Sequence, residues 1–298
     1  MAGIFSGLEK LGLGNIDGKN LFEDPKKKDA PVKKAEPQKK LTLVNEEDYL
    51  FDKKYKCPIC DSDFEVKTVR TGKVRMKSVD VDLRPDYSEV DLTKYDIIAC
   101  PECGYAALGR YYTSLNKYQI DDIRNKICMN YKKQKYDEPT YTYEHARSLY
   151  QLALANAVVK KAKNSEKAYI CLKTAWVIRG ETQRLDQNEA DYDKKKKEND
   201  EQELELLKNA INGFIMARQS EDFPIAGMDS TTLDYLIAAL AYETDQFDIA
   251  NKMISELLMS RTANSRIKDK ARALKELVAE KQAKYIYLII DHIIRPHG

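Results

Sequence analysis

The chain carries two short cysteine segments, Cys57-Pro-Ile-Cys60 and Cys100-Pro-Glu-Cys103, and the second is followed by Gly104. Each segment can present two thiolates to one tetrahedral ion, and the glycine permits the tight turn behind the second segment. Residues 61–99 separate the segments, a longer gap than the usual ~15–20 residues. The longer loop costs only about 0.7 kcal/mol, against about 10–16 kcal/mol for zinc binding. The four cysteines are therefore predicted to bind one metal ion.

The ligand type decides which metal and which role we expect. Four thiolates fill a tetrahedral coordination sphere and leave no position for a reactive water, so the predicted ion is a structural Zn²⁺. A rubredoxin-like iron centre uses the same ligands and remains an alternative, as do two redox-active CxxC pairs. The other two cysteines, Cys128 and Cys171, lie in apolar helical stretches and are interpreted as small buried side chains.

The residues between the cysteine segments alternate as strands do. Residues 64–70 and 73–79 flank a Thr71-Gly72 turn, which predicts a β-hairpin between the two ligand pairs and hence a zinc-ribbon-like head. The hairpin register places four cations on one face, where they are candidate contacts for RNA or DNA phosphates: Arg70, Lys73, Arg75 and Lys77. The acidic residues between positions 80 and 91 are expected to pair with these cations or to be solvated.

After Arg110 the apolar residues recur with a helical period to the end of the chain. They predict helices around 120–131 and 146–157, and further helices at about 165–185, 198–219, 230–243, 247–260 and 265–294. The predicted fold class is therefore α+β and mostly α. A small zinc-ribbon β-hairpin head is followed by a domain of helical hairpins.

Two of these helices fit the second-helix pattern of a tetratricopeptide repeat, namely Ala168-x3-Leu172-x2-Ala175 and Ala250-x3-Ile254-x2-Leu257. In that repeat the first helix of each pair lines a groove, so the register yields candidate contacts for a peptide: Tyr150, Lys160, Lys161, Tyr235 and Tyr242. A coincidental helical bundle, in which the tyrosines pack between helices, remains an alternative.

The first 44 residues have a different composition from the rest. Residues 24–44 form a predicted disordered linker rich in lysine and proline. Residues 1–23 contain a predicted short amphipathic segment that docks on a protein partner or a membrane surface through Ile4, Phe5, Leu8 and Leu11. The predicted organisation is thus a docking segment at 1–23, a linker at 24–44, a zinc-ribbon-like domain at 45–112 and a tetratricopeptide-like domain at 113–298.

Charge and composition limit the classes of function. The net charge is +2, but residues 24–40 hold seven lysines and three acids, so the rest of the chain is slightly acidic and unlike a generic polyanion binder. The chain has three histidines and no dinucleotide-binding fingerprint, so no catalytic residue is predicted. We expect no transmembrane segment and a cytoplasmic location, because neither a long apolar run nor a secretory signal is recognisable.

Beyond these patterns, the sequence resembles a known family. Residues 51–58, 82–85, 95–96 and 100–106 contain both cysteine segments and end in Cys-Gly-Tyr-Ala, and they are similar to the bacterial family catalogued as domain of unknown function 2225. The similarity extends from about residue 45 to the C-terminus. It implies a cytosolic bacterial protein with a zinc-ribbon-like head, a helical tail resembling tetratricopeptide repeats and no assigned activity.

The sequence predicts a non-catalytic zinc-binding adaptor that binds a protein or peptide partner through its helical domain. The main alternative is a zinc-ribbon protein that contacts RNA or DNA through the four hairpin cations. A rubredoxin-like electron carrier or a metal-dependent enzyme is a further alternative. Salt dependence separates the first two, because phosphate binding by several cations weakens steeply as ionic strength rises.

Overall fold

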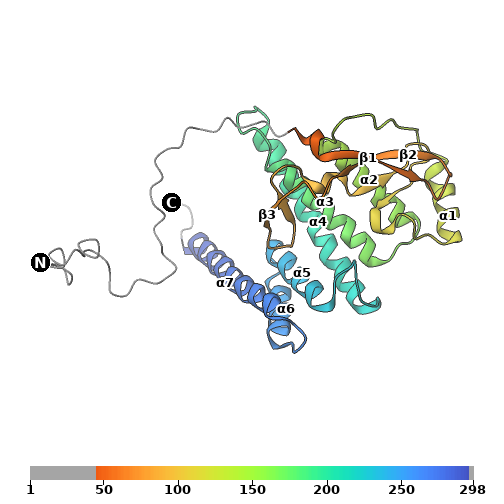
Figure 1. Cartoon of the computed structure of the whole chain (residues 1–298). Helices are drawn as coiled ribbons and strands as arrows, with labels where there is room; N and C mark the ends of the chain where they lie inside the picture. The colour runs from red at the N-terminus through yellow and green to blue at the C-terminus, as the bar shows by residue number, and fades with distance from the viewer. Residues whose placement is uncertain (1–44, 295–298) are drawn as a thin grey trace, which may run out of the picture. The chain divides into compact units, whose positions relative to one another are not determined.

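The structure is a computed structural model that describes residues 45–294, with side chains described as far as residue 284 (Figure 1). The predicted docking segment with Ile4, Phe5, Leu8 and Leu11, and the linker at 24–44, lie outside the described residues. The described part begins with short antiparallel strands: β1 (Leu50–Lys56), β2 (Asp63–Val69), β3 (Met76–Val79), β4 (Pro85–Tyr87), β5 (Ile97–Ala99) and β6 (Ala106–Leu108). They pair as β1 with β2, β3 with β4 and β5 with β6.

The predicted hairpin between residues 64–70 and 73–79 is wrong. Strand β2 pairs with β1, from Leu50 opposite Val69 to Lys56 opposite Asp63, and β3 pairs with β4 instead. The reason is that each cysteine segment itself reverses the chain, so that the strand before it meets the strand after it. The Thr71-Gly72 turn follows the end of β2 and does not join two paired strands.

Helices make up most of the remaining chain: α1 (Lys117–Ile123), α2 (Tyr143–Val159), α3 (Asn164–Thr182), α4 (Tyr192–Ser220), α5 (Ser230–Glu243), α6 (Phe247–Met259) and α7 (Ser265–Ile294). These bounds confirm the predicted helices from residue 146 onward, and with them the α+β, mostly α class. The helix predicted at 120–131 begins earlier, and its α-helical part ends at Ile123. Helix α4 begins earlier than predicted, and Lys195 and Lys196 pair there with Asp191 and Asp200 four residues away. A π-helical turn, Arg124–Cys128, follows α1.

The helices from α2 onward pack in chain order, each against the next, and α7 also contacts α5 (Figure 1). Helices α3 and α4 approach closely at Gly213, where an added Cβ would lie 2.8 Å from the Cβ of Ala168. None of the helices in the described part of the chain combines the length and the apolar character that a membrane crossing requires. The likeness to tetratricopeptide repeats and the boundary at residue 112 stay predictions.

Helix α2 is the element that joins the strands to the helices. Its small buried residues Ala146, Ala153 and Ala157 belong to the same core cluster as alternate residues of the two strands: Ile97 and Ala99 of β5, and Ala106 and Leu108 of β6. Small side chains on one helix face let a sheet approach closely, so this face of α2 is covered by β5 and β6.

The segment between β3 and the 3₁₀ helix η4 (Leu92–Tyr95), which includes β4, is anchored by buried charges, and this corrects the expectation for its acidic residues. Asp82 is fully buried and lies 2.9 Å from the guanidinium of Arg179, while Trp176 Nε1 donates a hydrogen bond of 2.8 Å to the same carboxylate. Of the four predicted hairpin cations, Lys77 does meet an acid, since its ammonium lies 3.6 Å from Asp86. Arg179 and Trp176 belong to α3, about a hundred residues later in the chain, so a local strand pattern cannot place them beside Asp82.

Candidate metal centre

The two cysteine segments adopt the same backbone geometry. In the first, the Cys57 N–H donates to the carbonyl oxygen of Ser62 at 2.9 Å, and the Asp61 N–H donates to that of Cys57 at 3.0 Å. The second repeats both bonds, with Cys100 N–H to Tyr105 at 2.8 Å and Gly104 N–H to Cys100 at 3.0 Å. The fifth position of each turn has a positive φ, 62° at Asp61 and 76° at Gly104. Each segment is therefore the turn of a hairpin, β1–β2 or β5–β6.

The requirement for glycine is strict in the second turn. A Cβ at Gly104 would lie 2.4 Å from the ring of Tyr131, which packs directly over this position. Aspartate is among the residues that tolerate a positive φ, and it occupies the equivalent position in the first turn. The two turns thus differ in sequence but satisfy the same backbone requirement.

The four predicted ligands meet at one point. The Sγ atoms of Cys57 and Cys103 lie 3.5 Å apart, those of Cys60 and Cys100 lie 3.7 Å apart, and all four lie within 4.8 Å of one another. A tetrahedral ion with bonds of about 2.3 Å to sulfur needs sulfur atoms roughly 3.8 Å apart. The spacing of the four Sγ atoms is therefore close to that of a tetrahedral site, and the group could hold a metal ion. Zinc and iron both suit four thiolates, so the ligand set does not choose between them.

The clustered thiols differ in their pKa. Hydrogen bonds with Cys100 and Cys103 lower the pKa of Cys57 to about 2. Hydrogen bonds with Cys100 and Cys57 raise the pKa of Cys103. Cys57, Cys100 and Cys103 are buried and Cys60 is exposed, so one edge of the group faces solvent. A cation that binds here has to displace the protons of the remaining thiols.

The π-helical turn supports the first cysteine segment, a contact that no sequence pattern indicated. Arg124 donates to the carbonyl oxygen of Ile59 through Nη2 at 2.8 Å and through Nε at 3.2 Å. At the other end of the turn, Cys128 is partly buried and packs against the core cluster that contains the metal-site thiols. Burial raises the pKa of Cys128, and burial raises that of Cys171 to about 11. Cys171 is buried as predicted, and Cys128 is buried only in part.

The four hairpin cations do not form one continuous face. Arg70 Nε donates to the carbonyl oxygen of Leu50 at 3.0 Å, and its guanidinium lies 5.2 Å from the centre of the Phe51 ring. Lys77 is paired as described above, whereas Lys73 and Arg75 are exposed. The reason is the strand pairing, because Arg70 follows β2 while Lys77 belongs to β3, in a different sheet.

Two of the three groove residues predicted for the first helix pair are buried. Tyr150 is fully buried, and its hydroxyl donates to the carbonyl oxygen of Thr93 at 2.9 Å. Lys160 is also buried and lies 2.7 Å from Glu166, while Lys161 is exposed. The repeat register assumed that this face of α2 is open, but β5 and β6 cover it.

The second set is covered as well, by α7. Tyr235 is 4% exposed, and the ammonium of Lys270 lies 5.4 Å from its ring centre. The ammonium of Lys281 lies 5.0 Å from the ring of the half-buried Tyr242. Both lysines come from α7, so these tyrosines pack between helices and present no groove. The predicted groove positions came from the repeat pattern of α5 and α6 alone. That pattern does not include α7, which lies later in the chain and packs on α5.

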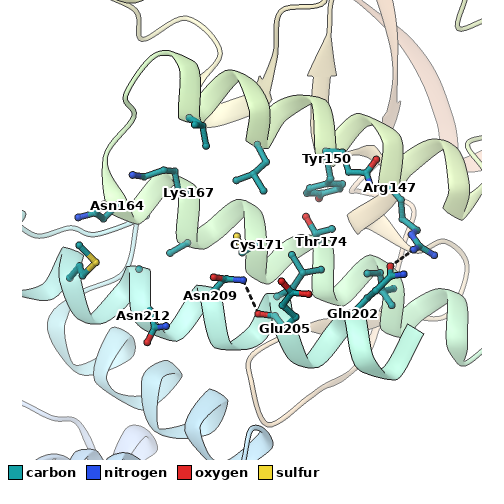
Figure 2. A pocket seen from close by; sticks show the side chains of 18 residues that line it. Arg147, Tyr150, Asn164, Lys167, Cys171, Thr174, Gln202, Glu205, Asn209 and Asn212 are labelled. Carbon is teal, nitrogen blue, oxygen red and sulfur yellow. Dashed lines mark hydrogen bonds between the residues drawn. The ribbon is translucent and has the colours of Figure 1, made fainter. Parts of the chain in front are cut away.

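A groove does exist, on a different face of the helices. A cavity of about 640 Å³ lies between α2 and α4, with α3 as its floor (Figure 2). The α2 wall presents residues that recur at helical spacing: Arg147, Gln151, Leu154 and Val158. This stripe is rotated from the predicted positions toward solvent, and Tyr150 is the one predicted residue that also borders the cavity.

The histidine of α2 has a structural environment. His145 Nδ1 lies 2.8 Å from Glu138, and its ring stacks on Tyr141 with a centroid distance of 4.6 Å. Within the described residues, the four cysteines are the only group of three or more His, Cys, Asp or Glu side chains placed to hold a metal ion.

Comparison with known proteins yields a single family. The family model described as an uncharacterized protein conserved in bacteria (DUF2225) matches residues 50–278, a range that includes both cysteine segments and extends into α7. No curated protein and no solved structure matches the chain.

Proposed function

The chain belongs to the bacterial DUF2225 family of uncharacterized proteins, and we propose that it is a non-catalytic adaptor. In this proposal a structural Zn²⁺ on Cys57, Cys60, Cys100 and Cys103 holds the strands together, and the helices bind a protein or peptide partner. The observation that carries the proposal is the closed set of four thiols, since it leaves a bound ion no open position for substrate or water.

The surroundings of the thiols support a structural role for the ion. The core cluster beside them is small, and three of its members are the buried ligands Cys57, Cys100 and Cys103. The hairpins that carry them are two-stranded, and such hairpins are marginal without further support. A bound ion replaces the missing apolar core, because its binding free energy becomes folding free energy.

Metal analysis tests the first half of the proposal. We expect about one zinc per purified full-length chain and loss of the ion in Cys100→Ser. Cys128→Ser is the matched control, since Cys128 packs near the site but lies outside the four-thiol group, and it should keep full occupancy. A red, iron-loaded protein from native cells would support the rubredoxin-like alternative, and full zinc occupancy in Cys100→Ser would contradict the four-cysteine site.

Crosslinking in native lysate, followed by partner identification, tests the second half. The adaptor proposal expects a defined protein partner whose recovery changes little with salt. The nucleic-acid alternative expects labelled RNA or DNA to bind with an affinity that falls steeply between about 50 and 200 mM salt. Lys73→Glu with Arg75→Glu separates them further, because these exposed cations are needed by the alternative and not by the adaptor.

A further inference from the structure

The groove between α2 and α4 is lined by both polar and apolar side chains. On α4, polar side chains lie along one stripe from Gln202 through Asn209 and Asn212, and Figure 2 shows them at the edge of the cavity. On α2, the cavity-lining residues toward the C-terminal end are apolar, Leu154 and Val158. A ligand that fills this groove therefore needs both hydrogen-bonding groups and apolar groups.

The amides of the groove have unused hydrogen-bonding capacity. Asn164 and Asn212 make no side-chain hydrogen bond within the described part of the chain, and Asn209 uses only its Nδ2, which donates to the carbonyl oxygen of Glu205 at 3.0 Å. A side-chain amide both donates and accepts, as a peptide main chain does. These asparagines therefore match the alternating N–H and C=O groups of an extended polypeptide.

One end of the groove combines exposed apolar side chains with an unpaired cation. Val158 is 60% exposed and Met216 is 54% exposed, and they border the cavity from α2 and α4. Gly213 packs on Ala168 and the carbonyl of Asn164, so this end lies beside the first turns of α3. Lys167 borders the same cavity and forms no ion pair with any described residue.

Other classes of ligand fit the groove less well. The second cation of the lining, Arg147, is already paired with Glu181 at 2.7 Å, so a nucleic acid backbone would meet too few free positive charges. A lipid or an apolar small molecule would cover the asparagine amides without offering them partners, which costs free energy.

We propose that this groove binds an extended peptide segment of a partner protein, with its main chain on Asn164, Asn209 and Asn212. One apolar side chain of the peptide packs between Val158 and Met216, and a neighbouring acidic side chain pairs with Lys167. This inference rests on the adaptor function proposed above and assigns its binding site and the chemistry of its ligand.

The dimensions of the groove set the length of the peptide. The lining of α4 runs from Gln202 to Met216, which is about 21 Å along a helix axis. An extended chain advances about 3.3 Å per residue, so roughly six peptide residues cover this distance.

Selection from a random library of twelve-residue peptides displayed on phage, against the zinc-loaded full chain, identifies the probe. We expect enriched peptides to share an apolar residue next to Asp or Glu. One selected peptide, labelled with fluorescein, then reports affinity by anisotropy.

Val158→Glu should weaken the binding of this peptide at least about tenfold, because the new carboxylate faces the peptide acid. Met259→Glu, a 77% exposed methionine on α6 outside the groove, is the matched control and should leave affinity unchanged.

Charge exchange gives a readout that a purely structural role would not produce. Lys167→Glu should weaken the selected peptide, and replacement of the peptide acid by lysine should restore binding to that variant alone. Circular dichroism should show unchanged folding, because the altered side chains reach solvent.

The inference is overturned by a library that yields no shared motif, or by peptides that bind Val158→Glu and Lys167→Glu as tightly as the wild type. A partner that still crosslinks to such variants would leave the adaptor function standing without this groove.

Discussion

The cysteine centre and the α5–α6 region are held together by different means. Around the thiols, short hairpins enclose a small core in which the ligands themselves are prominent members. Around α5 and α6, a large cluster from α3 through α7 buries side chains such as Phe214, Leu236 and Ile254 almost completely. The difference teaches that one region depends on an ion and the other on apolar burial. The two should therefore fail separately, which perturbation of each can test.

Loss of the ion should have the largest effect and should act on the strands. Chelation or Cys100→Ser removes a contribution on the order of 10 kcal/mol from the head. Hydrogen exchange should then become fast in residues 50–69 and 97–108, while amides of α5 and α6 stay protected. Uniform loss of protection across the chain would show that the helices depend on the metal as well.

Truncation of the helical core should have the converse effect. Phe214 is fully buried between helices, so Phe214→Ala should destabilise the protein by about 3–5 kcal/mol. Thermal unfolding measures the loss, and zinc content at 20 °C should remain one ion per chain. A variant that loses its zinc before its helices unfold would contradict the separation of the two regions.

Glu243 makes the stability of the helical region depend on pH. Burial, together with the charge of Asp82, raises its pKa from 4.5 to about 7, although it lies 2.7 Å from Arg179. Between these values the folded protein keeps a proton that the unfolded chain has lost, so stability should fall as pH rises through this window. Urea unfolding from pH 4.5 to 7 should show a shallower decline in Glu243→Gln. Burial also raises the pKa of Glu203, so some decline should remain.

The ion pair of the β3–β4 sheet should contribute least. Lys77 and Asp86 are 3.6 Å apart, and the lysine side chain is 68% exposed. Lys77→Ala should change the free energy of unfolding by less than about 0.5 kcal/mol, because solvent screens such pairs. A loss above about 2 kcal/mol in urea unfolding would mean that this small sheet contributes more to the fold than its exposure indicates.

Local sequence rules account for the parts of the molecule whose determinants lie close together in the chain. The helices from α2 to α7 follow from apolar period, and the turn at Gly104 follows from the conformation that the second cysteine segment requires. The pairing of the strands was not predictable in the same way. The alternation of apolar and polar side chains in residues 64–70 fits pairing with the strand before it, β1, as well as with residues 73–79 after it. Thr71-Gly72 has the residue types of a hairpin turn, but it is the first cysteine segment that closes the hairpin between β1 and β2.

The identity of the four clustered cysteines was determined by the sequence alone, since residue type and CPxC spacing prescribe a turn that presents two thiols together. The accessible face of the helices was decided only by tertiary structure. Tyr150 and Tyr235 have the same periodicity whether a helix face is open or covered, and β5, β6 and α7 cover the faces that hold them. Burial depends on elements far away in the chain, and a helical period records only that one face is apolar, not which element packs on it.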